Sequence, residues 1–264
     1  MPYRGKRSNR PAMRRTRKNR KISKPLKVAP SVKTYVNRVI ARNTENKVHI
    51  IYGSNVSITT AAGGTVPTSV NCLPVLGTGV GSFQRIGDEI KIKKAAIKGY
   101  INLLPYAAIT NPLSTPIYVK MWLCSSKIVN TSSLSSTDIG TQFFDTGSIA
   151  AGFQGNMLDM TLSNNLNNWK IHAQRTVQLG ATSVSSTGQV GSGGYFDNSK
   201  MSVPFYFNWA KYMKSKLKYN DSATNVITNK NLFLAFQAVN ADGSSSAINV
   251  AEFHYSQRIE YEDA

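Results

Sequence analysis

Cysteine and histidine are scarce in this 264-residue sequence, and neither residue forms a recognisable group. Cys72 and Cys124 are the only cysteines, so a disulfide framework is excluded and buried free thiols are expected. The three histidines, His49, His172 and His254, are scattered and share no metal-ligand spacing with the cysteines. No metal and no cofactor are therefore expected.

Long hydrophobic runs are also missing. The longest apolar run lies near Leu232 to Phe236 and is far too short to cross a bilayer. The N-terminal stretch from Met1 to Lys27 lacks the apolar segment of a secretory signal. Membrane insertion is therefore not expected.

Acidic residues are nearly absent from the N-terminal part of the chain. Residues 1–47 hold 16 of the 32 Lys and Arg and one acid, Glu45, which gives a net charge of +15. Residues 48–264 hold the other 16 against 12 acids, a net charge of +4. A tail of this kind binds polyanions, above all nucleic acid, because neutralising phosphates releases counterions whatever the base sequence. A merely solvated tail is the alternative.

Residues 1–30 carry few large apolar side chains, so they cannot bury enough surface to offset their ordering entropy. We predict a disordered Arg- and Lys-rich arm. Its denser block, Arg14, Arg15, Arg17, Lys18, Arg20 and Lys21, also has the composition of a nuclear localisation signal, which makes a host nuclear import receptor a candidate partner. The candidate nucleic-acid-binding residues of the arm are Arg4, Lys6, Arg7, Arg10, Arg14, Arg15, Arg17, Lys18, Arg20, Lys21, Lys24 and Lys27.

Residues 31–47 are predicted to form a short helical linker. Ser31 is a candidate cap, and Val32, Tyr35, Val36, Val39 and Ile40 recur at helical spacing. The opposite side of this helix carries three further candidate contacts to nucleic acid, Lys33, Arg38 and Arg42. A solvated helix face is an equally simple interpretation.

Residues 48–264 show short alternating segments separated by loops rich in Gly, Ser, Thr, Asn and Pro. About eight strands without long amphipathic helices predict an all-β fold, a single jelly-roll sandwich of two four-stranded antiparallel sheets. The expected strands are His49–Thr59, Glu89–Leu104, Ile117–Ser125, Trp169–Leu179, Met201–Trp209, Lys214–Tyr219, Leu232–Val239 and Ile248–Tyr261. The expected loops include Ala61–Ser82 and Ser126–Asp138.

The strand 89–104 holds the longest alternation. Its apolar positions change phase once, near Lys93 and Lys94. A β-bulge there would return the apolar set to one face. In the later segment Leu232–Phe236 both parities are apolar, which predicts a central strand covered on each side.

Two groups of lysines allow two interpretations. Lys214, Lys216 and Lys218 alternate with apolar residues and are candidates for a surface facing the interior of an assembly. Exposed lysines on a strand also prevent edge-to-edge pairing. The lysines of the longest strand, Lys91, Lys93, Lys94 and Lys98, present the same choice.

Catalytic motifs are weak. Phe144-Asp145-Thr146-Gly147-Ser148 matches the signature of aspartic proteases, but that chemistry needs two carboxylates sharing a proton, and the chain has no second Asp-Thr-Gly or Asp-Ser-Gly. A turn that closes a strand is the simpler interpretation. The glycines between Gly77 and Gly81 lack phosphate-loop spacing and are interpreted as a flexible loop. We expect no enzymatic activity.

The layout resembles capsid proteins of circovirus-like small circular single-stranded-DNA viruses. The resemblance lies in the basic arm, the linking helix, the segment Gln84–Ile90 leading into a long strand, the strand Trp169–Leu179, the Lys-rich late strand and a C-terminal strand near the last residue. It implies self-assembly into an icosahedral shell and an arm that lines the interior against the genome. Single-stranded DNA is then favoured over RNA, and the protein belongs in the virion and, during assembly, in the host nucleus.

Charge and resemblance together predict a capsid protein that packages a small single-stranded genome. With about 60 copies in a homo-oligomeric shell, the arms would carry roughly 900 positive charges, so no base readout is required. The alternative is a non-capsid nucleic-acid-binding protein with a monomeric β-domain.

Overall fold

The computed structural model describes residues 29–35, 46–60, 68–104, 116–132, 142–145, 150–180, 201–220, 225–241, 243 and 249–263. The chain divides into two units, Met1–Asn43 and Thr44–Ala264. All of the arm up to residue 28 lies outside the described residues.

Within the first unit, residues 30–35 are helical. The amides of Val32 and Lys33 both donate to the carbonyl of Ala29, at 3.0 and 3.1 Å. Pro30 therefore occupies the first helical position, where its missing amide proton costs nothing. The expected cap at Ser31 is wrong, because Ser31 lies inside the helix. The predicted linker positions Arg38 and Arg42 lie outside the described residues.

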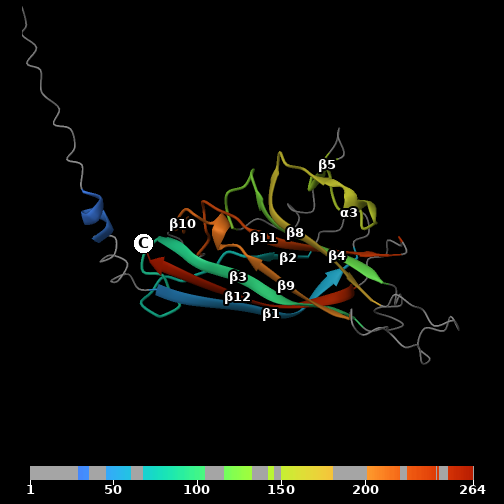
Figure 1. Cartoon of the computed structure of the whole chain (residues 1–264), viewed down its shortest axis with the longest axis horizontal. Helices are drawn as coiled ribbons and strands as arrows, with labels where there is room; N and C mark the ends of the chain where they lie inside the picture. Colours follow the sequence, from blue (N-terminus) through green and yellow to red (C-terminus); the bar gives the residue numbers. More distant parts are fainter. Residues whose placement is uncertain are drawn as a thin grey trace, which may run out of the picture. The chain divides into compact units, whose positions relative to one another are not determined.

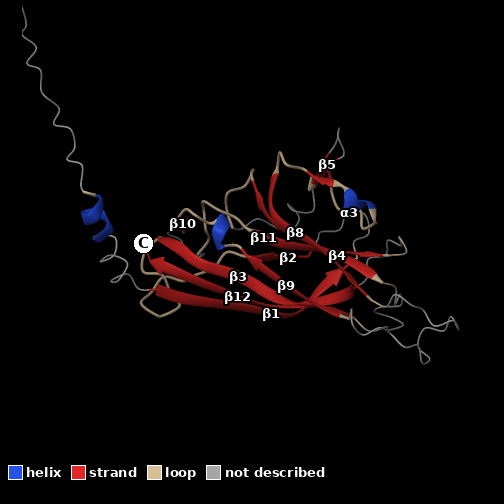
Figure 2. Ribbon diagram, viewed as in Figure 1, coloured by secondary structure: helices blue, strands red, loops and turns tan. Residues whose placement is uncertain are grey.

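The second unit consists of two antiparallel sheets with short connecting elements (Figures 1 and 2). Sheet A has the strand order β1-β12-β3-β10, and β9 also pairs with β3; sheet B has the order β2-β11-β4-β8. The strands are β1 (Asn46–Thr59), β2 (Thr68–Asn71), β3 (Glu89–Leu103), β4 (Ile117–Ser126), β8 (Trp169–Leu179), β9 (Ser202–Asn208), β10 (Leu217–Lys218), β11 (Phe233–Asn240) and β12 (Asn249–Asp263). A small third sheet pairs β5 (Phe144–Asp145) with β6 (Ala150–Ala151) and β7 (Ser163–Asn164), close to α3 (Leu158–Thr161).

The strand pairing is that of a jelly roll. Leaving aside the two-residue strand β10 and the small third sheet, the first strand pairs with the last, the second with the next to last, and so on inward: β1 with β12, β2 with β11, β3 with β9, and β4 with β8, all antiparallel. This nested order is what a long antiparallel hairpin produces when it is wrapped into two packed sheets. The predicted fold class is confirmed.

The predicted β-bulge in the longest strand is present. Glu260 pairs with Lys94 but the next residue, Tyr261, pairs with Ile92, so Lys93 is the extra residue. Ile90 and Ile92 before the bulge and Ile97 and Ile101 after it are all buried. The bulge thus keeps a single face of β3 in the core.

The main core lies between the two sheets. Every residue of β11 is buried, because Leu234, Phe236 and Ala238 face this core while Phe233 and Ala235 join a second cluster on the other face of sheet B. The prediction of a central strand covered on both sides is confirmed. The aromatic rings of Phe236 and Phe253 stack across the sandwich with centroids 4.2 Å apart.

The second cluster was not predicted. Segments that the sequence left without structure fold over the outer face of sheet B and bury Phe143, Phe144 and Phe153 against Trp122 and Trp169. The ring centroids of Trp122 and Phe143 are 5.4 Å apart, and those of Phe144 and Phe153 are 4.9 Å apart. Edge-to-face contacts of this kind add to the stabilisation from burial.

Some predicted boundaries are wrong. Strand β1 begins at Asn46 instead of His49, so Lys47, which the sequence places in the linker, belongs to the sandwich. β2 lies inside the expected loop Ala61–Ser82. The predicted strand Lys214–Tyr219 shrinks to Leu217–Lys218, and a 3-10 turn at Ala210–Tyr212 precedes it.

Both cysteines are free and buried, as predicted. Burial raises the pKa of the Cys124 thiol to about 12 and raises that of Cys72 further, because an apolar interior disfavours the thiolate. No described helix is long and apolar enough to span a bilayer.

We expect Gly99→Ala to destabilise the protein. An added Cβ would lie 1.9 Å from the carbonyl oxygen of His254 on the neighbouring strand, and the backbone there is fixed by pairing on both sides of β3. The free energy of unfolding should fall by about 1–3 kcal/mol in urea denaturation. Gly77→Ala is the matched control, because nothing lies within 4 Å of its added Cβ; equal losses in the two variants would contradict the packing argument.

Candidate nucleic-acid interface

The arm residues predicted to bind nucleic acid, from Arg4 to Lys27, lie outside the described residues, as does the nuclear localisation block Arg14–Lys21. Of the predicted set, Lys33 alone is described. It is exposed on the helix 30–35, and its helical turn is fixed by the hydroxyl of Thr34, which donates to the carbonyl of Pro30 at 2.9 Å. The side of the helix assigned to nucleic acid is thus open at this position.

The late lysines do not form the predicted row of three on one strand face, because β10 is only Leu217–Lys218 and both Lys214 and Lys216 precede it. Lys216 and Lys218 do share a side, and both bind the carboxylate of Glu89, at 3.1 and 3.0 Å. Their hydrogen bonds, that of Lys218 first, lower the pKa of Glu89. Glu89 therefore neutralises one of the two positive charges of this pair within the molecule.

The lysines of β3 divide into two groups. Lys93 pairs with Glu262, and Lys94 pairs with Glu260 at 3.0 Å. Lys91 and Lys98 are exposed and take part in none of the ion pairs among the described residues. Lys98 and Lys91 are therefore the cations of this strand that remain available to an external anion.

A buried cation that the sequence did not single out organises one end of the sandwich. Arg85 is 1% exposed. Its Nε donates to the carbonyl of Leu76 at 3.3 Å, and its Nη1 donates to the carbonyl of Gly87 at 2.6 Å and to the carboxylate of Asp88 at 2.8 Å. The guanidinium also lies 4.5 Å from the centre of the Tyr219 ring.

The glycine-rich segment, which the sequence indicates as a flexible loop, is hydrogen-bonded to Arg85 through its backbone. The amide of Arg85 donates to the carbonyl of Gly77, and the amide of Gly79 donates to the carbonyl of Arg85. Lys47, 3% exposed, adds a second buried cation, since its Nζ donates to the carbonyl of Gln84 at 2.8 Å and pairs with Asp263 at 2.7 Å. Both cations serve the fold instead of an external ligand.

A third polar group lies on the outer face of sheet B. Asp159 is fully buried, and its Oδ2 accepts hydrogen bonds from the amides of Gln154 and Gly155, at 2.8 and 2.7 Å, and from the side-chain amide of Gln237. Lys120 donates to the carbonyl of Met160 at 2.7 Å. Burial lowers the pKa of Lys120, and the nearby Asp159 opposes this shift. These hydrogen bonds of Asp159 and Lys120 hold the segment around Asp159 against the outer face of sheet B.

The structure gives the protease motif a structural role. Phe144 is buried in the aromatic cluster, and Asp145 is exposed on the two-residue strand β5. Residues 146–149 of the motif lie outside the described residues. Among the described residues, no three His, Cys, Asp or Glu side chains gather as a metal site would require.

Among the solved structures that are similar to this chain, three are those of viruses. One, from Desmodium yellow mottle tymovirus, is 11% identical with a TM-score of 0.36, over 83% of this chain and 87% of that chain. The second, from mud crab tombus-like virus, is 11% identical with a TM-score of 0.32, over 83% of this chain and 79% of that one. The third, from Macrobrachium rosenbergii nodavirus, is 12% identical with a TM-score of 0.27, over 99% of this chain and 59% of that one.

No protein-family model matches the sequence, and no curated protein does. Because the identities and TM-scores of these solved structures are low, the comparison gives no evidence about the fold beyond the strand order of this chain itself. The jelly-roll assignment therefore follows from the pairing within this chain.

We expect Arg85→Met to lower the free energy of unfolding by about 2–4 kcal/mol, because it leaves buried carbonyl groups without a donor. Arg258→Met is the control: that side chain is 65% exposed and pairs with Glu260 at 3.1 Å, so its loss should cost about 0–1 kcal/mol. Urea denaturation of both variants measures the difference. Losses of similar size would show that Arg85 is not a structural centre.

His172 is expected to make the stability of the fold depend on pH. Burial, aided by the charge of Lys170, lowers the pKa of its imidazole to about 4, and its Nε2 lies 2.9 Å from the hydroxyl of Ser125. The folded protein keeps this ring neutral while the unfolded chain takes up a proton below about pH 6.5, so stability should fall as the pH drops from 6.5 towards 4. In His172→Gln this fall should be smaller; parallel curves of melting temperature against pH would refute the assignment.

Proposed function

We propose that this protein is a viral capsid protein, which assembles into a closed shell and packages a single-stranded genome through its basic N-terminal arm. The main observation in support is that one chain joins a strongly basic N-terminal segment to a body of nearly balanced charge. Residues 1–47 have a net charge of +15, whereas the remainder, which contains the jelly roll, has a net charge of +4. Nearly balanced bodies can tile a symmetric shell, while the arms bind the polyanion.

The jelly roll itself supports the shell function through its covered surfaces. The outer face of sheet B is closed over by the aromatic cluster and the Asp159 group, and the carbonyl-rich loop at the end of sheet A is held by Arg85. Described loops that are held in this way present the same contacts in every copy, which symmetric assembly requires. About 60 copies would make the smallest icosahedral shell of this kind.

Genome type and cellular location are finer parts of the proposal. The resemblance of the sequence to circovirus-like proteins favours single-stranded DNA, and the block Arg14–Lys21 would then carry the protein into the host nucleus through an import receptor. Digestion by DNase or RNase of nucleic acid extracted from native virions distinguishes the two genomes.

The rival function is a monomeric β-domain that binds nucleic acid outside a shell. Its basic tail would bind nucleic acid equally well, since counterion release needs only a charged segment. The mass of the purified protein in solution therefore distinguishes the two functions. Sedimentation of the purified protein should give megadalton particles or capsomers, whereas a stable monomer at low salt and high concentration would favour the rival.

Electron microscopy of the expressed protein tests the proposal directly. The full chain should form closed particles that contain nucleic acid, and deletion of residues 1–28 should leave the sandwich folded but remove most of that nucleic acid, because the core lies in the second unit. The ratio of absorbance at 260 and 280 nm of purified particles measures the content. The assigned role of the arm would be refuted by truncated particles that package normally.

A further inference from the structure

Three tyrosines stand exposed on the outer face of sheet A, away from the core. Tyr52 of β1 is 81% exposed, Tyr100 of β3 is 57% exposed and Tyr206 of β9 is 59% exposed. Phe205 and Phe207, the neighbours of Tyr206 along β9, point the other way and are buried. The exposed rings contribute nothing to the core, so their position calls for another explanation.

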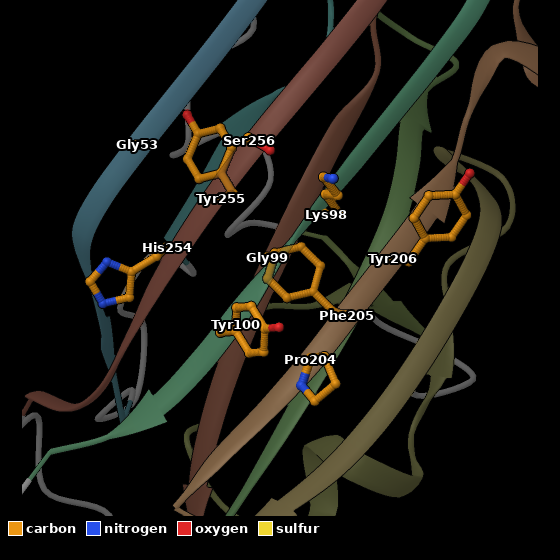
Figure 3. Close-up of a pocket in the computed structure, with 10 residues that line it drawn as sticks. All are labelled: Gly53, Lys98, Gly99, Tyr100, Pro204, Phe205, Tyr206, His254, Tyr255 and Ser256. Carbon is orange, nitrogen blue, oxygen red and sulfur yellow. The ribbon is translucent and has the colours of Figure 1, made fainter.

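The strand register brings the three rings onto one surface. Tyr52 pairs with Ser256, Ser256 with Lys98, and Lys98 with Tyr206, which makes a continuous row across four strands. The adjacent row runs from His254 through Tyr100 to Pro204. Figure 3 shows Lys98 between Ser256 and Tyr206, and Tyr100 beside Pro204. We call the set Tyr52, Lys98, Tyr100 and Tyr206 the tyrosine face.

The spacing of these rings suits successive bases. Neighbouring strands lie about 4.8 Å apart, and Tyr100 and Tyr206 are diagonal neighbours, whose separation is about 7–8 Å. Lys98, Tyr100 and Tyr206 line an open groove of about 500 Å³ together with His254 and Ser256. The imidazole of His254 is held in place, since its Nδ1 accepts the amide proton of Asn55 at 3.3 Å.

The ion pairs around the groove leave Lys98 open to an anion. Of the glutamates on the outer side of β12, Glu260 is paired with Lys94 and Arg258, and Glu262 is paired with Lys93. Glu252 is the third, and it pairs in register with Asn102 beyond Tyr100. Lys98, at the centre of the tyrosine face, joins no ion pair among the described residues and is exposed. A phosphate can therefore reach it without displacing a carboxylate.

We propose that the tyrosine face is a second nucleic-acid contact, on which unpaired bases stack against Tyr100 and Tyr206 while Lys98 binds the phosphate between them. Aromatic rings on an open sheet, with a cation among them, are the usual means by which proteins hold single strands without reading their sequence. The proposal extends nucleic-acid binding from the arm to the folded body. That this contact lies inside a shell rests on the proposed function. The exposed Lys98 at the centre of the tyrosine face and the neighbouring Ser256 and Ser202 argue against an interface between identical subunits, where lysine and serine are depleted.

The first test compares two double variants of the full chain. Tyr100→Ala with Tyr206→Ala removes both stacking surfaces, whereas Tyr100→Phe with Tyr206→Phe keeps them. Binding of fluorescent dT20 and rU20 is measured by anisotropy at 0.5 M salt, where the phosphate contacts of the arm are strongly weakened. We expect the alanine variant to bind about tenfold more weakly or worse, and the phenylalanine variant to bind like the unchanged protein. Equal affinities in all three would overturn the proposal.

A lysine pair supplies the matched test of charge. Lys98→Gln should weaken binding of the same oligonucleotides several-fold, and Lys170→Gln should leave it unchanged, because Lys170 is exposed on β8 of the other sheet. Equal effects of the two substitutions would mean that positive charge anywhere on the body suffices, and the proposed site would be wrong.

Photocrosslinking needs no substitution and so is independent of any folding defect. Ultraviolet irradiation of the full chain with bromodeoxyuridine-substituted dT20, followed by mass spectrometry, should place adducts on Tyr100 or Tyr206. Adducts confined to residues 1–47 would overturn the tyrosine face. A double alanine variant that fails to assemble but binds oligonucleotide like the unchanged protein would show that a second copy of the chain covers this face, which also overturns it.

The two proposals can fail separately. Particles that form and contain nucleic acid, without crosslinks to the tyrosines, would remove the tyrosine face and leave the capsid function standing. Crosslinks to the tyrosines in a protein that stays monomeric under every condition would do the reverse.

Discussion

The position of β12 between β1 and β3 is the constraint on which the rest of the sandwich depends. This C-terminal strand pairs along nearly its whole length with both neighbours, although β1 lies about 200 residues earlier in the chain. Loop closure over such a separation costs entropy before any contact is made, and the long pairing of β12 with both neighbours offsets that cost. The ion pair between Lys47 and Asp263 fixes the end of this pairing at 2.7 Å.

The buried cations extend the same constraint into the loops. Lys47 and Arg85 bind adjacent stretches of the segment before β3, one through the carbonyl of Gln84 and the other through those of Leu76 and Gly87. A buried cation is tolerated only where several acceptors surround it. Here those acceptors are mostly backbone carbonyls, so each cation replaces the pairing partners that an irregular loop lacks. The loop is thereby fixed relative to the sheet it leads into.

The sequence was sufficient to predict what depends on local periodicity. Alternating apolar residues located most strands, the phase change in β3 located the bulge at Lys93, and the two-sided apolar segment identified β11 as central. β2 was missed because Thr68–Asn71 is short and only partly buried on both sides. The aromatic cluster was missed because its phenylalanines lie in irregular chain, where no period marks them.

The roles of Arg85 and the three tyrosines could not be predicted for a different reason. A single arginine beside glycines has the pattern of a solvated loop, and the Tyr219 ring that packs against its guanidinium lies more than 130 residues away in the sequence. Tyr100 and Tyr206 occupy outward positions on two strands, and nothing in the sequence of either strand shows that the two strands are neighbours in one sheet. Register between distant strands created both groups, and register is set by the whole fold.

The separation of charge within the chain links packaging to assembly. The N-terminal segments 1–47, each of net charge +15, repel one another when bodies come together, and the nearly balanced bodies do not offset this repulsion by charge. A single strand bound by the arms removes the repulsion through counterion release, which weakens as salt rises. Stacking on the tyrosine face depends on contact area instead of charge, so it would persist at salt concentrations where the arms let go. In a shell, the arms would then set how much nucleic acid enters, and the tyrosine face would hold part of it in a fixed position against the folded body.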